Sequence, residues 1–196
     1  PYKKQVKKRL YGRTKPGTLL KHQIPIKAER WETTEPGFGE IDLVSHSGDR
    51  ADGEFIHTLT FTDIHSTWTE TRAVMGKSQA FVQEALDDIR DKLPFPMRGI
   101  DSDNGSEFIN AVLIEFCSQH AIEQTRSRPY RKNDQAFVEQ KNGAVVRRLV
   151  GYGRLQGVAA VEALARLYAA SRLFVNFFQP SFKLAEQTRH GARTTK

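Results

Sequence analysis

Apolar and polar residues alternate over three successive segments of the chain, at 39–45, 54–64 and 67–75. Alternation with a period of two predicts half-buried β-strands. In the second segment, Leu59 and Phe61 fall on one face and Thr60 falls on the other. Polar turn residues separate the first two segments, so we expect the three strands to form an antiparallel meander.

The apolar spacing then changes to that of helices. Phe81, Ala85, Ile89 and Leu93 recur every four residues, which predicts a helix over 78–93 that ends at Pro94. Similar patterns predict further helices at 106–120, 134–150 and 158–178, and short strands at 97–100 and 122–125. The order β-β-β-α-β-α-β-α-α indicates an α/β fold, in which helices flank a mixed five-stranded sheet.

Three regions follow from this order. Residues 1–35 are rich in Lys and Arg and are interrupted by Pro-Gly pairs, so we expect a basic N-terminal arm or linker. Residues 36–153 form the main domain, and residues 154–196 form a C-terminal helix and tail. Because the first residue is Pro, we expect the chain to be a piece of a longer protein.

Composition narrows the class of protein. The 196 residues are 38% hydrophobic, which is enough for a sizeable core. No apolar run approaches the ~20 residues that span a bilayer, and the charged start does not resemble a signal peptide. Cys117 is the single cysteine, which excludes an internal disulfide and a Cys/His zinc module. We therefore expect a cytoplasmic protein without a membrane segment.

The net charge of +7 conceals two basic blocks around an acidic middle. Residues 1–30 carry +9, residues 31–125 carry −12, residues 126–154 carry +6 and residues 155–196 carry +4. This arrangement is typical of a protein that grips a polyanion around a carboxylate-rich centre that holds cations. A basic tail next to a solvated acidic surface would give the same pattern.

Three acidic residues occupy unusual positions. Asp42 lies inside the first predicted strand between two large apolar residues, so its side chain must point away from their face. Asp103 follows the fourth predicted strand, in a turn with Asn104-Gly105, and strand ends are where open α/β sheets place ligands. Glu139 lies one turn into the helix predicted from residue 134. Taken singly, each also fits a structural role as a capping residue, a turn residue or a solvated helix acid.

The combination of these acids is more specific than any one of them. Residues 102–108 read Ser-Asp-Asn-Gly-Ser-Glu-Phe, and 35 residues separate Asp103 from Glu139. Here the sequence resembles the catalytic core of retroviral integrases and of the DDE transposases of bacterial insertion sequences. Their pattern is an Asp on the first strand, a second Asp in an S/T-D-N-G motif and a Glu at this spacing. The resemblance spans about residues 36–150, and segments 128–134, 138–142 and 176–180 look most like the bacterial transposases.

The resemblance implies an RNase H-like fold and phosphoryl transfer that depends on divalent metals. Two Mg²⁺ or Mn²⁺ ions are expected with DNA bound, with Asp42 bridging both and Asp103 and Glu139 each holding one; oxygen ligands suit these hard cations. Water would cleave the transposon end, and the freed 3′-OH would attack target DNA. It also implies a homodimer or larger assembly on DNA, in the bacterial cytoplasm near the nucleoid.

The basic stretch before Glu139 is the expected DNA contact, because a basic loop next to a metal site is well placed to hold phosphates. The candidates in the loop and on the following helix are Arg128, Arg131, Lys132, Asn133, Gln135, Lys141 and Asn142. The alternative is a solvated basic surface.

Five further residues are weaker candidates for a functional role. Asp101 is an alternative to Asp103 as a ligand, whereas Glu107 is expected to face solvent. His46 either approaches the site or DNA or has no role. Asp63 is expected to cap a turn, and Cys117 to be a small buried hydrophobe.

Two other functions remain open from the sequence. A stand-alone RNase H-like nuclease would cut nucleic acid without joining it. A non-catalytic DNA-binding module would do neither, although such a module is expected to lack at least one of the three acids, and all three are present.

Overall fold

A computed structural model describes residues 20–27, 33–129, 132–179, 188–190 and 193–195. Its centre is a five-stranded sheet in the order β3-β2-β1-β4-β5. The strands are β1 (Phe38–Ser45), β2 (His57–Asp63), β3 (Thr69–Val74), β4 (Gly99–Ser102) and β5 (Glu123–Arg126). A separate two-stranded hairpin is formed by β6 (Thr188–His190) and β7 (Arg193–Thr195).

The sheet is mixed, as the sequence predicts. Strands β1, β2 and β3 pair antiparallel, so the expected meander is confirmed. Strand β4 then pairs parallel to β1, and β5 pairs parallel to β4. In this register Glu40 lies opposite Asp101, which places polar residues of two neighbouring strands side by side.

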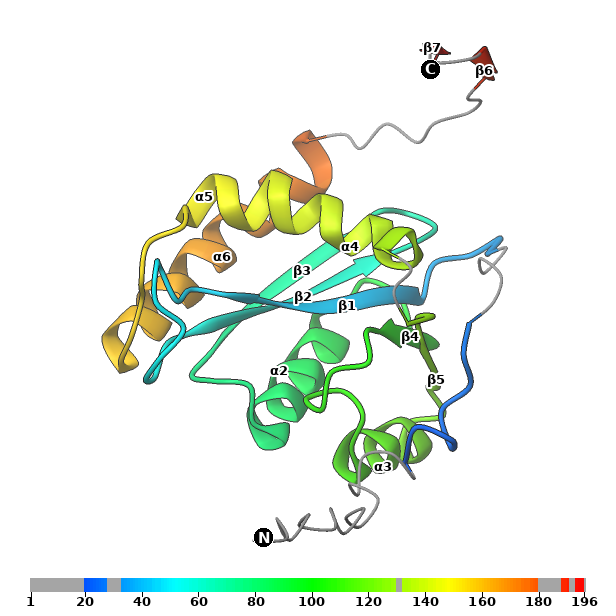
Figure 1. Ribbon diagram of the computed structural model, residues 1–196, viewed down its shortest axis with the longest axis horizontal. Coiled ribbons are helices and arrows are strands. Elements are labelled where there is room, and N and C mark those ends of the chain that lie inside the picture. Colours follow the sequence, from blue (N-terminus) through cyan, green and yellow to red (C-terminus); the bar gives the residue numbers. More distant parts are fainter. Residues whose placement is uncertain (1–19, 28–32, 130–131, 180–187, 191–192, 196) are drawn as a thin grey trace, which may run out of the picture.

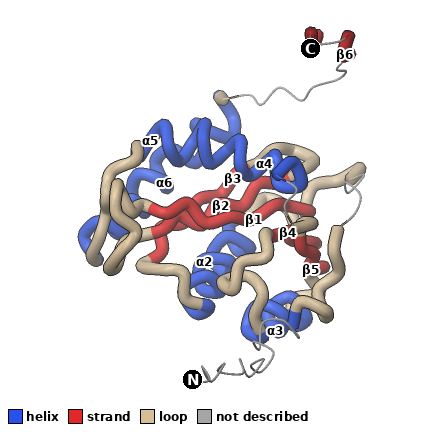
Figure 2. Tube along the Cα trace, in the orientation of Figure 1, coloured by secondary structure: helices blue, strands red, loops and turns tan. Residues whose placement is uncertain are grey.

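Helices cover both faces of the sheet (Figures 1 and 2). Helices α2 (Gln79–Lys92) and α3 (Ala111–Gln119) lie on one face. The other face carries α6 (Val158–Phe178) and a continuous helical stretch that begins with a 3₁₀ turn. That stretch comprises the 3₁₀ turn η1 (Lys132–Gln135), α4 (Ala136–Lys141), the π-helix η2 (Asn142–Arg147) and α5 (Arg148–Val150).

The two faces of the sheet differ in chemistry. The face under α2 and α3 is apolar: its fully buried side chains include Ile41, Phe61 and Ile100, which pack against the two helices. Burying this apolar surface is the main driving force for folding. The opposite face carries buried threonines of β2, including Thr60 and Thr62, beside the acids of β1 and β4. The sequence alternation that placed Leu59 and Phe61 opposite Thr60 is therefore confirmed.

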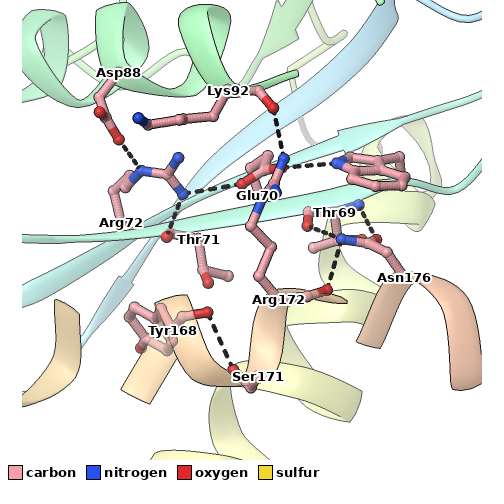
Figure 3. Close-up of polar contacts among 11 residues, drawn as sticks. Thr69, Glu70, Thr71, Arg72, Asp88, Lys92, Tyr168, Ser171, Arg172 and Asn176 are labelled. Carbon is pink, nitrogen blue, oxygen red and sulfur yellow. Dashed lines mark hydrogen bonds and ion pairs between the residues drawn. The ribbon is translucent and has the colours of Figure 1, made fainter. Parts of the chain in front are cut away.

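Helix α6 is held against edge strand β3 by a buried carboxylate (Figure 3). Glu70 is fully buried and pairs with Arg72 of its own strand at 3.0 Å and with Arg172 of α6 at 2.6 Å. The indole N–H of Trp68 donates to the same carboxylate at 2.7 Å. Asn176 adds two hydrogen bonds to the backbone of Thr69. These contacts hold α6 along β3, while α4 packs on β1 and β2 of the same face.

Three of the differences from the predicted elements concern segments that carry the candidate acids or adjoin them. Strand β4 is two residues later than expected and includes Asp101 and Ser102, because it is paired on both sides with parallel strands. Helix α3 begins only at Ala111, because Asn110 accepts the N–H of Leu113 and caps it there. The helix predicted over 134–150 is divided into 3₁₀, α and π segments.

The sequence also predicted a basic arm before the main domain and a C-terminal helix and tail after it. The division into 1–35, 36–153 and 154–196 stays a prediction. Within the described residues, no helix combines the length and the apolar character that a membrane crossing requires.

Candidate active site

Asp42 lies near the middle of β1 and projects from the polar face, as the alternation with Ile41 predicts. Its carboxyl group is half-buried and accepts a hydrogen bond from Asn142 Nδ2 at 2.7 Å. Burial, with a smaller effect from the negative charges of Asp103, Glu139 and Glu107, raises the pKa of Asp42 to about 6. The carboxyl group of Asp42 is therefore affected by the charges of several neighbouring acids.

Asp103 stands directly after β4, in a turn that its own side chain shapes. The N–H of Gly105 donates to Asp103 Oδ1 at 2.8 Å, and Asn104 Nδ2 donates to the carbonyl of Ser127 at 2.9 Å. A Cβ at Gly105 would lie 2.7 Å from the Glu107 carboxyl carbon and 2.9 Å from Asp103 Oδ1, so a larger residue there would displace the two carboxyl groups. The residue is exposed, yet partial desolvation of its carboxyl group and the charge of Glu107 raise the pKa of Asp103.

A segment of the basic arm supports this turn. Ile26 forms a parallel bridge with Arg126 of β5, and Ile24 is buried. The Arg126 guanidinium donates to the carbonyls of Lys21 and Ile24 at 3.2 and 3.1 Å and to Asn104 Oδ1 at 3.0 Å. Residues 20–27 thus pack along β5, and Arg126 joins them to the turn that carries Asp103. No sequence pattern predicted this link.

Glu139 lies on α4 with its side chain exposed to solvent. The helix contacts β1 and β2 and lies across this part of the sheet (Figure 1), and Asn142, which follows it, bonds Asp42. The N–H groups of Phe137 and Val138 both donate to Glu40 Oε2 at 2.9 Å. The three predicted acids thus come from a strand, a turn and a helix, and the charges of Asp103 and Glu139 both act on Asp42.

The candidate acids offer the type of donor atom that a hard divalent cation prefers. These donors are carboxylate oxygens, which Mg²⁺ and Mn²⁺ prefer. Asn142 adds a buried side-chain oxygen next to Asp42, and this Oδ1 has no hydrogen-bond partner in the described part of the chain. Over the same residues, no three His, Cys, Asp or Glu side chains form a group that could hold a metal ion. The charges of Asp103 and Glu139 thus act on Asp42, but in the described residues the three side chains do not form a metal-binding group.

The other sequence candidates occupy varied positions. Asp101 is buried and accepts the Thr125 hydroxyl at 2.6 Å, whereas Glu107 is half-buried beside Asp103. His46 is fully buried and bonds Thr58 at 2.8 Å, so it reaches neither the site nor the surface. Burial lowers the pKa of His46 to about 4.

Two structural expectations are confirmed. Asp63 caps its turn by accepting the N–H and the hydroxyl of Ser66, both at 2.6 Å. Cys117 is buried in the main core, where desolvation raises the pKa of its thiol to about 12.

The predicted DNA contacts are less uniform than the sequence suggested. Arg128 is exposed, but its guanidinium and N–H bind the Asp134 carboxylate at 2.7 to 3.0 Å. Gln135, Lys141 and Asn142 are all buried, so they face the packed side of the helix and not solvent. Burial also lowers the pKa of Lys141. Arg131 lies outside the described residues, as do the side chains of Lys132 and Asn133, and the DNA-binding role of the whole set stays a prediction.

Comparison with known proteins identifies the family of this chain. The family model described as integrase core domain matches residues 33–132, slightly more than half of the chain. The chain belongs to the integrase core domain family. The matched span contains Asp42 and Asp103 and ends before Glu139. This membership supports the catalytic core of a polynucleotidyl transferase within the transposase and integrase superfamily.

A curated relative comes from a bacterium. The chain is 49% identical over 180 residues to the uncharacterized protein y4rM of Sinorhizobium fredii. The match covers 91% of this chain and 51% of y4rM, so the integrase core chain spans about half the length of that relative.

Solved structures confirm the fold. The chain resembles a chain of the simian T-cell lymphotropic virus intasome in complex with PP2A regulatory subunit B56 gamma (TM-score 0.61, 18% identity, 79% of this chain and 53% of that one). It also resembles the catalytic core domain of BIV integrase (0.55, 15%, 74% and 87%) and that of HTLV-2 integrase in complex with magnesium, in a dimeric form (0.54, 16%, 74% and 89%). The mixed sheet with flanking helices is an RNase H-like fold, as predicted.

Proposed function

We propose that this chain is the catalytic core of a DNA transposase that cleaves and joins DNA strands by a DDE mechanism. One observation carries the proposal: in an integrase core domain, the charges of Asp103 and Glu139 both act on the carboxyl group of Asp42. A half-buried carboxyl group whose pKa is raised by burial and by acids from other elements is typical of a catalytic site.

Asp42, Asp103 and Glu139 would hold Mg²⁺ or Mn²⁺, and Asn142 Oδ1 is a further oxygen beside them. When bound, such ions activate the attacking hydroxyl and stabilise the leaving oxygen of a phosphodiester. The protein orients the acids: Asn142 holds Asp42, and the Gly105 N–H holds Asp103. Magnesium is bound in the similar HTLV-2 core, which supports the choice of metal.

The surroundings of the site support DNA as the partner. Residues 126–154 carry a net charge of +6, and this block contains the helix of Glu139. The chain would act as a homodimer or larger assembly on transposon ends and target DNA, since the integrases it resembles include an intasome and a dimeric core. We further propose that this chain works in the bacterial cytoplasm at the nucleoid, because its relative y4rM is bacterial and because DNA is the proposed substrate of this chain.

The test measures cleavage and joining of labelled duplex DNA with Mg²⁺ or Mn²⁺. Asp42→Asn, Asp103→Asn and Glu139→Gln should each abolish strand cleavage while changing DNA affinity little. Asp101→Asn should retain cleavage, because Asp101 is buried and already bonded to Thr125. Full activity in any of the first three variants would refute the three-acid assignment. A parent that cuts but never joins would be a nuclease, and one that binds without cutting would be a DNA-binding module.

A further inference from the structure

Glu40 is a buried acid for which the sequence suggested no role. It lies two residues before Asp42 on β1, so the two side chains project from the same polar face. Its exposed fraction is 3%. A carboxylate is costly to bury unless hydrogen bonds compensate it, so its partners indicate its purpose.

Those partners are the opening N–H groups of the Glu139 helix. Phe137 and Val138 both donate to one oxygen of Glu40, Oε2, at 2.9 Å. The first N–H groups of a helix have no acceptor within it. In the described part of the chain, Gln135, the residue before α4, supplies no side-chain cap. Glu40 therefore caps α4 from another element, almost a hundred residues earlier in the chain.

The surface beneath α4 makes this cap more important. The helix crosses β1 and β2, where Thr60 and Thr62 present hydroxyl groups that are buried and lack hydrogen-bond partners among the described residues. Val138 is the fully buried apolar side chain of α4 itself. The following π-helix adds buried Val145 and Val146, whereas the first turn of α4 is fixed to the sheet by its hydrogen bonds to Glu40.

Helix α4 is tied to β1 at both ends. Glu40 holds its first turn, and Asn142, which follows its last residue, donates to Asp42 at 2.7 Å. Glu139 lies between these two attachments and directly follows Val138, whose N–H bonds Glu40. A change at the Glu40 attachment therefore shifts Glu139 relative to Asp42.

We propose that Glu40 is a positioning residue that sets the distance between Glu139 and Asp42 by capping the Glu139 helix from the strand of Asp42. The proposal rests on the proposed function for its catalytic consequence, but not for the cap itself. Glu40 does not need to touch metal or DNA. Its effect passes through the backbone of Phe137 and Val138.

The structure provides a sharp pair of variants. Because both N–H groups use a single oxygen, Glu40→Gln retains an acceptor in the same place, whereas Glu40→Leu has a similar size and no acceptor. Glu70→Gln is the matched control, since Glu70 is also a fully buried carboxylate but lies on β3 beside Arg72 and Arg172. All rates are measured below the unfolding range and normalised to folded protein.

Two readouts separate the cap from its catalytic effect. The first is amide hydrogen exchange at Phe137 and Val138, which should accelerate about 10-fold or more in Glu40→Leu and remain near the parent rate in Glu40→Gln. The second is DNA cleavage against Mg²⁺ concentration, where Glu40→Leu should lose roughly 10–100-fold in rate or apparent Mg²⁺ affinity, as is usual when support of a metal ligand is removed. Glu40→Gln should recover most of that loss, and Glu70→Gln should lower thermal stability without changing Mg²⁺ dependence.

Each result decides one part of the proposal. Unchanged exchange in Glu40→Leu would overturn the cap, whether or not the protein cleaves DNA. Accelerated exchange with parental cleavage and Mg²⁺ dependence would overturn the positioning role. Equal impairment of Glu40→Gln and Glu40→Leu would also overturn it, because charge and not hydrogen bonding would then be the cause. A parent that shows no cleavage would refute the proposed function, while the exchange readout would still decide whether Glu40 fixes the helix.

Discussion

The raised pKa of Asp42 makes a quantitative prediction for the metal-free protein. A carboxylate whose pKa is higher in the folded state than in the unfolded state binds protons preferentially when folded. The free energy of unfolding then falls as pH rises from the unfolded to the folded pKa, and the loss is complete above the latter. For Asp42 this window runs from 3.8 to about 6. Replacing Asp42 by Asn removes the penalty, so the variant should be more stable than the parent at neutral pH.

The size of the effect follows from the shift. About two pKa units correspond to about 3 kcal/mol, at ~1.4 kcal/mol per unit. For a chain of this length this raises the thermal midpoint by roughly 6–12 °C. The hydrogen bond from Asn142 should survive, because the amide oxygen at position 42 can accept it as the carboxylate does. The difference should become small near pH 4 and vanish below about pH 3, where the parent carboxyl group is protonated in both states.

The assay is urea unfolding in EDTA at about pH 8 and about pH 4, with Asp42→Asn compared to the parent at each pH. Asp91→Asn is the control, because this carboxylate is 65% exposed and pairs with its neighbour Arg90 on α2. Removing such a surface pair changes stability by at most about 1 kcal/mol.

Two results would refute the reasoning. Equal stability of parent and Asp42→Asn at pH 8 would mean that the folded protein does not penalise this charge. A stabilisation of the same size at both pH values would mean that the gain has another cause, such as improved packing. Only a gain that grows between pH 4 and 6 identifies the carboxylate as a site kept at a cost to stability.

Two further predictions concern the same site. Mn²⁺ or Mg²⁺ at a hundred times its dissociation constant should stabilise the parent by about 2.7 kcal/mol, measured as a thermal shift relative to EDTA. Asp103→Asn should lose this gain, and an equal shift in the variant would place the metal elsewhere. Arg126→Gln should release residues 20–27 from β5, because its guanidinium binds the Lys21 and Ile24 carbonyls and the Asn104 side chain. Trypsin should then cut after Lys21 and Lys27 faster than in the parent; an unchanged rate would show that Arg126 does not hold this segment.

Much of the fold could be predicted because its local patterns agree with its tertiary environment. Alternation located β1, β2 and β3, and the four-residue spacing from Phe81 located α2 within one residue at each end. The direction of Asp42 also followed from alternation, since Ile41 had to face the core. These features depend on short stretches of chain whose period shows which side is buried.

The errors arose where distant segments override local preference. Asp101 and Ser102 have turn chemistry, yet they belong to β4 because parallel strands on both sides satisfy their backbone. Lys141 and Gln135 were predicted to face DNA but are buried, because helical spacing shows which residues share a face and not which face packs on a polar sheet. The prediction of a helix from residue 134 gave no sign of Glu40, which caps α4 from β1.

Residue type and local period were enough to nominate Asp42, Asp103 and Glu139 as candidate metal ligands and to predict the element or turn that carries each of them. Tertiary contacts established that the charges of Asp103 and Glu139 act on Asp42 and that Glu40 and Arg126 hold the segments around them. The physical reason is that these contacts join residues from about 20 to 100 positions apart through parallel strand pairing and buried hydrogen bonds. No local pattern encodes which distant donor will meet a buried acceptor.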